Sequence, residues 1–172
     1  MGPGAVIVCQ LRGANDAELA TVGGRRVICV RPKLTPERVR WGLLHELSEW
    51  HLDGRVGAQI EVACEALTAC MVAPRAAFLR EVREHGQQWV TLARRFVTSE
   101  TCVALRYGEV CDVPIAVDAP TVPRARGPER GWHDEQTIRK LARAKTLPLG
   151  LRRERLVDDA RRVVLLEDGA EG

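Results

Sequence analysis

Two histidines and two glutamates lie close together in the segment His45-Glu46-Leu47-Ser48-Glu49-Trp50-His51. In the pattern H-E-x-x-H, two histidines one helical turn apart bind zinc, and the glutamate takes a proton from the bound water. His45 and Glu46 match this pattern, but Glu49 stands where the second histidine belongs. His51 follows His45 by six residues, about 120° around a helix, and is no simple substitute. Metal chemistry here therefore depends on whether Glu49 can act as a ligand.

The residues around this motif predict an amphipathic helix that begins at Pro36. Thr35 is a good N-cap residue, proline suits the first helical position, and the acidic Glu37 is favourable near a helix N-terminus. The apolar stripe of this helix consists of Val39, Leu43, Leu47 and Trp50. His45 and Glu49 lie one turn apart on a different face, where both could point at one ion. A buried helix with a polar edge would show the same pattern.

A second helix is predicted over residues 60–74, which end in a proline. Its apolar stripe consists of Ile60, Cys64, Leu67 and Met71. Glu61 and Glu65 lie one turn apart on another face, and they could simply be a pair of solvated glutamates. A tight turn at residues 53–57 predicts that this helix folds back antiparallel to the first. Glu61 would then approach the two candidate ligands of the first helix and supply the third ligand that an open catalytic metal site needs.

Three blocks of the chain, taken in order, resemble the ImmA/IrrE family of bacterial metallo-endopeptidases. Residues 39–50 resemble the active helix of that family, and residues 61–74 resemble the segment that follows it. Residues 92–107 resemble the third block of the family. The resemblance implies a zincin-like fold, with a sheet beside the active helix. It also implies a protein substrate, often a transcriptional repressor.

The resemblance gives each residue of the site a role. His45, Glu49 and Glu61 would hold the metal, Glu46 would act as the general base, and Glu65 would orient a ligand. One nitrogen and two carboxylates suit zinc less selectively than two histidines do, so we expect a divalent metal, zinc first, with manganese or magnesium as alternatives. Two carboxylates also neutralise the ion, which should acidify its bound water less. The expected function is metal-dependent peptide hydrolysis, weakened or lost; the alternative is a non-catalytic binding or regulatory protein on the same scaffold.

The composition is typical of a globular cytoplasmic protein. Hydrophobic residues make up 45% of the 172 residues, which is enough for a core, and the net charge of +3 is too small to predict nucleic-acid binding. No segment approaches a membrane span or a signal peptide, so no membrane partner is expected. The six cysteines form no C-x-x-C pair and are interpreted as reduced, mostly core residues.

Strand signals precede the motif helix. Residues 5–11 and 18–30 predict strands, and Gly23-Gly24 is a two-residue hairpin signal within the second of these segments. A small twisted sheet should therefore pack on the motif helix. The fold class is α+β, followed by a helical segment and a short C-terminal extension of helix and strand.

The helical segment at about residues 88–108 resembles a helix-turn-helix. Because the excess of basic over acidic residues is small, we expect these helices to pack under the core, and we do not expect direct DNA binding. We assign residues 1–111 to a metallopeptidase-like domain that includes these helices. Residues 112–172 would form an extension of linker, short helix and strand, since four prolines lie near its beginning.

Overall fold

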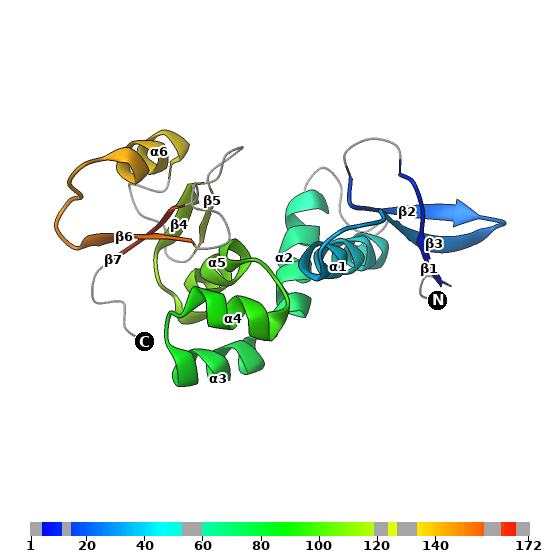
Figure 1. Ribbon diagram of the computed structural model, residues 1–172, viewed down its shortest axis with the longest axis horizontal. Helices are drawn as coiled ribbons and strands as arrows, with labels where there is room; N and C mark the ends of the chain where they lie inside the picture. Colours follow the sequence, from blue (N-terminus) through cyan, green and yellow to red (C-terminus); the bar gives the residue numbers. More distant parts are fainter. Residues whose placement is uncertain are drawn as a thin grey trace. The chain divides into compact units, whose positions relative to one another are not determined.

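The chain forms two compact units, residues 1–74 and residues 75–172. The computed structural model describes residues 5–11, 15–52, 60–118, 124–126, 134–156 and 163–167. Its helices and strands together make a mixed α+β fold, as the sequence predicts (Figure 1).

The first unit combines a three-stranded sheet with two helices. Its elements are β1 (Ala5–Val8), β2 (Ala17–Val22), β3 (Arg25–Val30), α1 (Pro36–Leu52) and α2 (Ile60–Val72). The strand order is β1-β3-β2, with β1 parallel and β2 antiparallel to β3. Consequently β2 is an edge strand. Gly23 and Gly24 join β2 to β3 with φ angles of +57° and +77°, the left-handed values that a type I′ hairpin requires at both central positions.

The core of the first unit lies between β3 and α1. Ile28 and Val30 are buried on the sheet, and the leucines and valine of the predicted apolar stripe pack against them. Gly42 lets α1 approach β2 closely, because a Cβ atom at this position would lie 3.0 Å from the Cβ of Ala17. The helix that carries the histidine motif is therefore packed directly against the edge strand.

We expect Gly42→Val to lower the free energy of unfolding by about 1–3 kcal/mol, because the added side chain would push α1 away from β2. His51→Val is the matched control, since His51 is exposed on the same helix and takes the same β-branched residue. Urea unfolding followed by tryptophan fluorescence measures both variants. Equal stability of the two variants would show that the close contact between α1 and β2 is unimportant.

The packing of α2 on α1 differs from the predicted stripe. The buried residues of α2 include Cys64, Thr68 and Val72, whereas Leu67 and Met71 are only partly buried. A buried hydrogen bond of 3.0 Å joins the hydroxyls of Ser48 and Thr68. Small polar residues therefore lie in the contact between α1 and α2, where the predicted stripe placed larger apolar residues. The predicted turn between the helices, residues 53–57, lies outside the described residues.

The second unit begins with three helices and continues as a sheet covered by one helix. Its elements are α3 (Arg75–His85), α4 (Trp89–Phe96), α5 (Glu100–Cys111), β4 (Ile115–Asp118), β5 (Arg124–Arg126), α6 (Glu135–Arg143), β6 (Leu151–Arg155) and β7 (Val163–Glu167). All neighbouring strands are antiparallel in the order β5-β4-β7-β6. Helix α6 packs Ile138 and Ala142 against Ala116 and Leu165 of this sheet. The extension is thus more extensive than the predicted short helix and strand.

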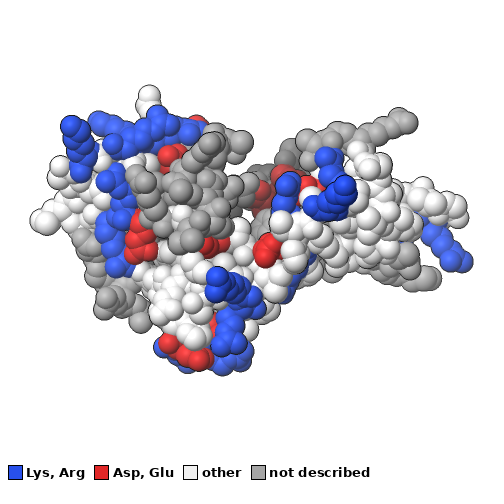
Figure 2. Space-filling view, viewed as in Figure 1, with Lys and Arg blue, Asp and Glu red and all other residues white. Residues whose placement is uncertain are grey.

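Helices α4 and α5 occupy the segment that resembles a helix-turn-helix. Val97 adopts a left-handed conformation between them, and the Ser99 side chain caps α5 by accepting from the Cys102 N–H. Helix α5 is buried along most of its length, including Val103 and Tyr107, so it has little surface to offer a DNA groove. On the face drawn in Figure 2, basic and acidic side chains are interspersed in the described part of the second unit.

The boundary between the compact units falls after Pro74, so α4 and α5 belong to the second unit. The domain division after residue 111 stays a prediction.

All six cysteines are free thiols. Among the described helices, none is by itself long and apolar enough to cross a membrane; the bent pair Glu61–Val72 and Arg75–His85 meets the length and composition criteria only when both helices are taken together.

Candidate functional site

His45 and Glu61 come together from α1 and α2. The Nε2 atom of His45 lies 3.7 Å from Oε1 of Glu61. The imidazole is 19% exposed, and its Nδ1 atom is buried with no hydrogen-bond partner among the described residues. Glu61 stands in the first turn of α2 and is largely exposed. A histidine and a glutamate from different helices thus meet at the surface, although they are 16 positions apart in the sequence.

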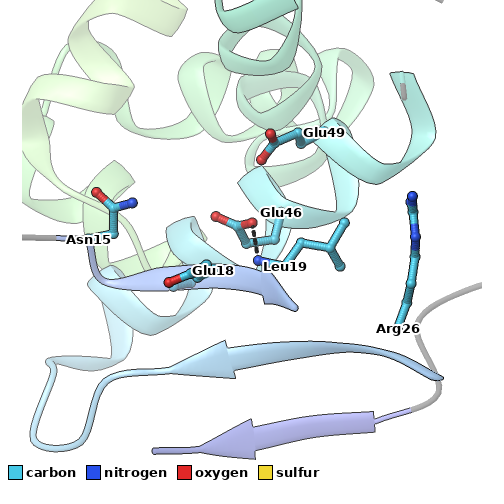
Figure 3. A pocket seen from close by; sticks show the side chains of 7 residues that line it. Asn15, Glu18, Leu19, Arg26, Glu46 and Glu49 are labelled. Atoms are coloured by element: carbon cyan, nitrogen blue, oxygen red, sulfur yellow. Dashed lines mark hydrogen bonds between the residues drawn. The ribbon is translucent and has the colours of Figure 1, made fainter. Parts of the chain in front are cut away.

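Glu49, the third predicted ligand, faces elsewhere. It lines a pocket together with Glu46, on the side of α1 toward β2 (Figure 3). Within the described parts of the chain, the ligand atoms of His45, Glu49 and Glu61 do not all lie within 4.8 Å of one another. Glu65 follows Glu61 by one turn and is half-buried. The three-ligand set and the orienting role of Glu65 therefore stay predictions.

Glu46 is the most buried acidic residue of the motif, with 7% of its surface exposed. The Leu19 N–H of β2 donates a hydrogen bond of 2.7 Å to its Oε2 atom, while Oε1 has no hydrogen-bond partner among the described residues (Figure 3). Burial raises the pKa of the Glu46 carboxyl, and the charge of Glu49 raises it further. The Leu19 amide and His45 oppose this rise in the pKa without cancelling it.

The hydrogen bond to Glu46 also shows which way β2 faces. The Leu19 N–H points away from β3, since it donates to α1. Backbone groups alternate in direction along an antiparallel ladder, so those of Ala17 and Thr21 also point outward. Helix α1 covers this outer side at the buried Ala17, whereas Thr21 is exposed. The edge of β2 is therefore partly covered beside the motif and open farther along.

The pocket between β2 and α1 has a volume of about 340 Å³. The described residues that line it are Asn15, Ala17, Glu18, Leu19, Arg26, Glu46 and Glu49 (Figure 3). Three of these side chains are carboxylates and one is a guanidinium, so the pocket is acidic. Burial of Glu46 in particular makes the pocket a place where a proton can be held or transferred.

The donor set at this site fits a divalent cation. Ligands of one zinc ion lie about 2.0–2.2 Å from it, which leaves neighbouring ligand atoms about 3–4 Å apart. The 3.7 Å separation of the His45 nitrogen and the Glu61 oxygen is in this range. Glu49 follows His45 by one turn of α1, so a change of side-chain rotamer could bring its carboxylate toward the same ion.

A second group with metal-binding residue types was missed by the sequence interpretation. Glu81, Glu84 and His85 of α3 have ligand atoms all within 4.8 Å of one another, with His85 Nε2 3.6 Å from Glu81 Oε2. Their spacing of three and four residues on one helix could have indicated the group. Arg95 also lies 3.5 Å from Glu81, so ion pairing accounts for the cluster without a metal.

Comparison with known proteins shows to which family the chain belongs. The family model of the IrrE N-terminal-like domain, a peptidase family, matches residues 5–107. The chain belongs to this family. The match covers more than half of the chain, and it agrees with the resemblance based on three sequence blocks. The scaffold is accordingly metallopeptidase-like, and the match ends before the sheet of the second unit.

A solved structure extends the likeness in fold. A Mycobacterium tuberculosis transcriptional regulator is similar with a TM-score of 0.59, and the alignment covers 96% of this chain and 76% of that protein. Sequence identity is 14%, so this likeness concerns the fold alone. No curated protein gives a match to this chain.

Proposed function

We propose that this member of the IrrE family is a metal-dependent peptide hydrolase whose site is built on His45, Glu46, Glu49 and Glu61. The observation that carries the proposal is the position of Glu46. Its carboxyl is buried beside an acidic pocket, and it neighbours the histidine that meets Glu61. His45, Glu49 and Glu61 would hold the ion, zinc first, with manganese or magnesium as alternatives.

When bound, the metal would supply a Lewis acid that makes a water molecule more acidic. Glu46 would take the proton from that water at Oε1, the oxygen that has no hydrogen-bond partner in the described part of the chain. A raised pKa makes this carboxylate a better proton acceptor, and the Leu19 N–H keeps its other oxygen in place. Glu65, one turn after Glu61, would orient a ligand.

The proposed substrate is a regulatory protein in the cytoplasm, of the class of transcriptional repressors. The basis is the resemblance of the chain to the ImmA/IrrE endopeptidases, together with its membership in the IrrE family. The six free cysteines agree with a reducing compartment. The activity is expected to be weak, because two carboxylate ligands acidify a bound water less than two histidines do.

A non-catalytic binding or regulatory protein is the second candidate, and one contact favours it. Oε2 of the proposed base is already engaged by the backbone of β2, and Glu49 stands in place of a histidine. In that case the acidic pocket would bind a partner without turning it over. Metal affinity and turnover then separate the two candidates.

We expect the purified chain, dialysed against zinc, to retain about one equivalent of metal and to lose most of it in His45→Ala. His51→Ala is the control, because His51 is exposed on the same helix outside the proposed ligand set. Plasma mass spectrometry measures the metal, and cleavage of a co-expressed repressor measures the activity. Metal retained in His45→Ala but lost in His85→Ala would place the ion on α3 and contradict the proposed site.

A further inference from the structure

We infer that Cys9 and Cys29 form a reversible oxidation site, in which a hydroperoxide converts the two thiols to a disulfide between β1 and β3. The two cysteines are 20 positions apart in the sequence, and each is a free thiol in the structure. No short motif marks them, because only the fold brings them together. Disulfides of reducing compartments are mostly transient and catalytic or redox-sensing, and the proposed bond is of this class.

The pairing of β1 with β3 brings the two side chains to one face of the sheet (Figure 1). In this parallel pair Ile7 lies opposite Cys29, and Cys9 follows Ile7 by two residues. Side chains two residues apart on a strand point to the same side, so Cys9 and Cys29 share a face. The Cys9 N–H donates a hydrogen bond of 3.0 Å to the Val30 carbonyl, which extends the pairing past the end of β1. The thiols of Cys9 and Cys29 are in hydrogen-bond contact.

The pair lies on the face of the sheet that is turned away from α1. Ile28 and Val30 pack against residues of α1, and Cys29 stands between them in β3. Because side chains alternate along a strand, the Cys29 side chain points to the opposite face. The pair is therefore separate from the proposed metal ligands and general base, and the inference does not depend on the proposed hydrolysis.

Different burial gives the two thiols different roles. Cys29 is 8% exposed, whereas Cys9 is only partly buried and open to a small oxidant. Burial raises the pKa of the Cys29 thiol, and the neighbouring Cys9 thiol and Glu18 raise it further. Since the thiolate is the reactive form of cysteine, the peroxide reacts first with Cys9, and Cys29 then resolves the product.

Two steps complete the oxidation. The Cys9 sulfur attacks one oxygen of hydrogen peroxide, so that an S–O bond forms, the O–O bond breaks, and the products are a sulfenic acid and water. The Cys29 sulfur then attacks the Cys9 sulfur, so that the S–S bond forms and the S–O bond breaks. The hydroxyl group leaves as a second water with the proton of Cys29. The two thiols together lose two electrons and two protons, and one peroxide becomes two waters.

The disulfide would close a loop that contains the whole of β2. Strand β1 is an edge strand of four residues, so it can shift slightly to reach the S–S bond length of about 2.05 Å. The cross-link would restrict the unfolded chain, and we expect it to raise the urea midpoint by about 1 M.

Peptide mapping of the full chain after mild oxidation tests this inference. The protein is treated with a few equivalents of hydrogen peroxide in the presence of a chelator, and the remaining thiols are blocked with N-ethylmaleimide. Trypsin places Cys9 in residues 1–12 and Cys29 in residues 27–33. We expect these two peptides to be joined, two hydrogen atoms lighter than their sum, and to separate again when dithiothreitol is added.

Cys9→Ser should abolish both the joined peptide and the rise in the urea midpoint that peroxide produces. Cys70→Ser is the matched control, because Cys70 is an exposed thiol on α2, and it should change neither result. Three results of the mapping would overturn the inference: sulfenic acid at Cys9 without the joined peptide, cross-links spread over the other cysteines, or a disulfide that forms only between two chains.

Discussion

Glu49→His is expected to tighten zinc binding by about tenfold or more, because imidazole suits zinc better than a second carboxylate does. Peptide hydrolysis should rise with it. Removing one anionic ligand leaves more net positive charge on the ion, and a more positive ion acidifies its water more strongly. Glu49 already lies one helical turn from His45, so the histidine would complete the spacing of the H-E-x-x-H motif.

The measurement is zinc titration with a competing chromogenic chelator, alongside cleavage of a co-expressed candidate repressor. Glu49→Gln is the matched control, since it removes the charge without supplying an imidazole. It should weaken zinc binding. Unchanged zinc affinity in Glu49→His would mean that position 49 does not face the metal, and the binding-protein candidate would then be preferred.

Glu46→Gln, introduced together with Glu49→His, is expected to lower turnover by about 10²–10⁴-fold, the usual contribution of a general base. Zinc affinity should remain, because Glu46 serves as base and not as ligand. The fold should also remain, since the amide oxygen of glutamine can still accept from the Leu19 N–H. This variant therefore separates loss of chemistry from loss of structure.

Initial rates of cleavage and the urea midpoint are measured on the same preparation of that double variant. Turnover that survives the substitution would remove Glu46 from the mechanism. A large fall in the urea midpoint would instead assign Glu46 a mainly structural role, in which its contact with β2 holds the edge strand against α1.

Local signals explain why much of the first unit could be predicted. Gly23-Gly24 predicted the hairpin because both positions need left-handed angles, and both adopt them. Thr35 and Pro36 predicted the start of α1, which begins at Pro36. The pattern of apolar residues and the turn and cap residues of a short segment are enough to predict such elements. The interactions that stabilise these elements lie within a few residues of one another.

Long-range contacts explain what could not be predicted. The hydrogen bond from Leu19 to Glu46 joins residues 27 positions apart, and no local pattern indicates that the proposed base is held by the edge strand. The buried pair of Ser48 and Thr68 likewise depends on how α2 lies against α1. The buried face of α2 therefore includes Thr68, whereas Leu67 is only partly buried. The direction in which Glu49 points is decided in the same way, by packing between elements.

The arginine-rich β6 was missed for a different reason. Its sequence, Leu151-Arg-Arg-Glu-Arg155, lacks the β-branched and aromatic residues that indicate strands. It forms an edge strand, where charged side chains are tolerated and oppose unwanted pairing. Arg153 also donates to the carbonyls of Ala142 and Ala144 at the end of α6, an interaction that only the folded sheet makes possible.

X-ray absorption at the zinc edge of the zinc-loaded full chain tests the central claim most directly. The ligand set of His45, Glu49 and Glu61 predicts a single imidazole per zinc, with oxygen atoms as the remaining ligands. In Glu49→His the spectrum should show two imidazoles, and in His45→Ala it should show none. A wild-type spectrum without imidazole, or one that is unchanged in His45→Ala, would contradict the assignment of the metal site to α1 and α2.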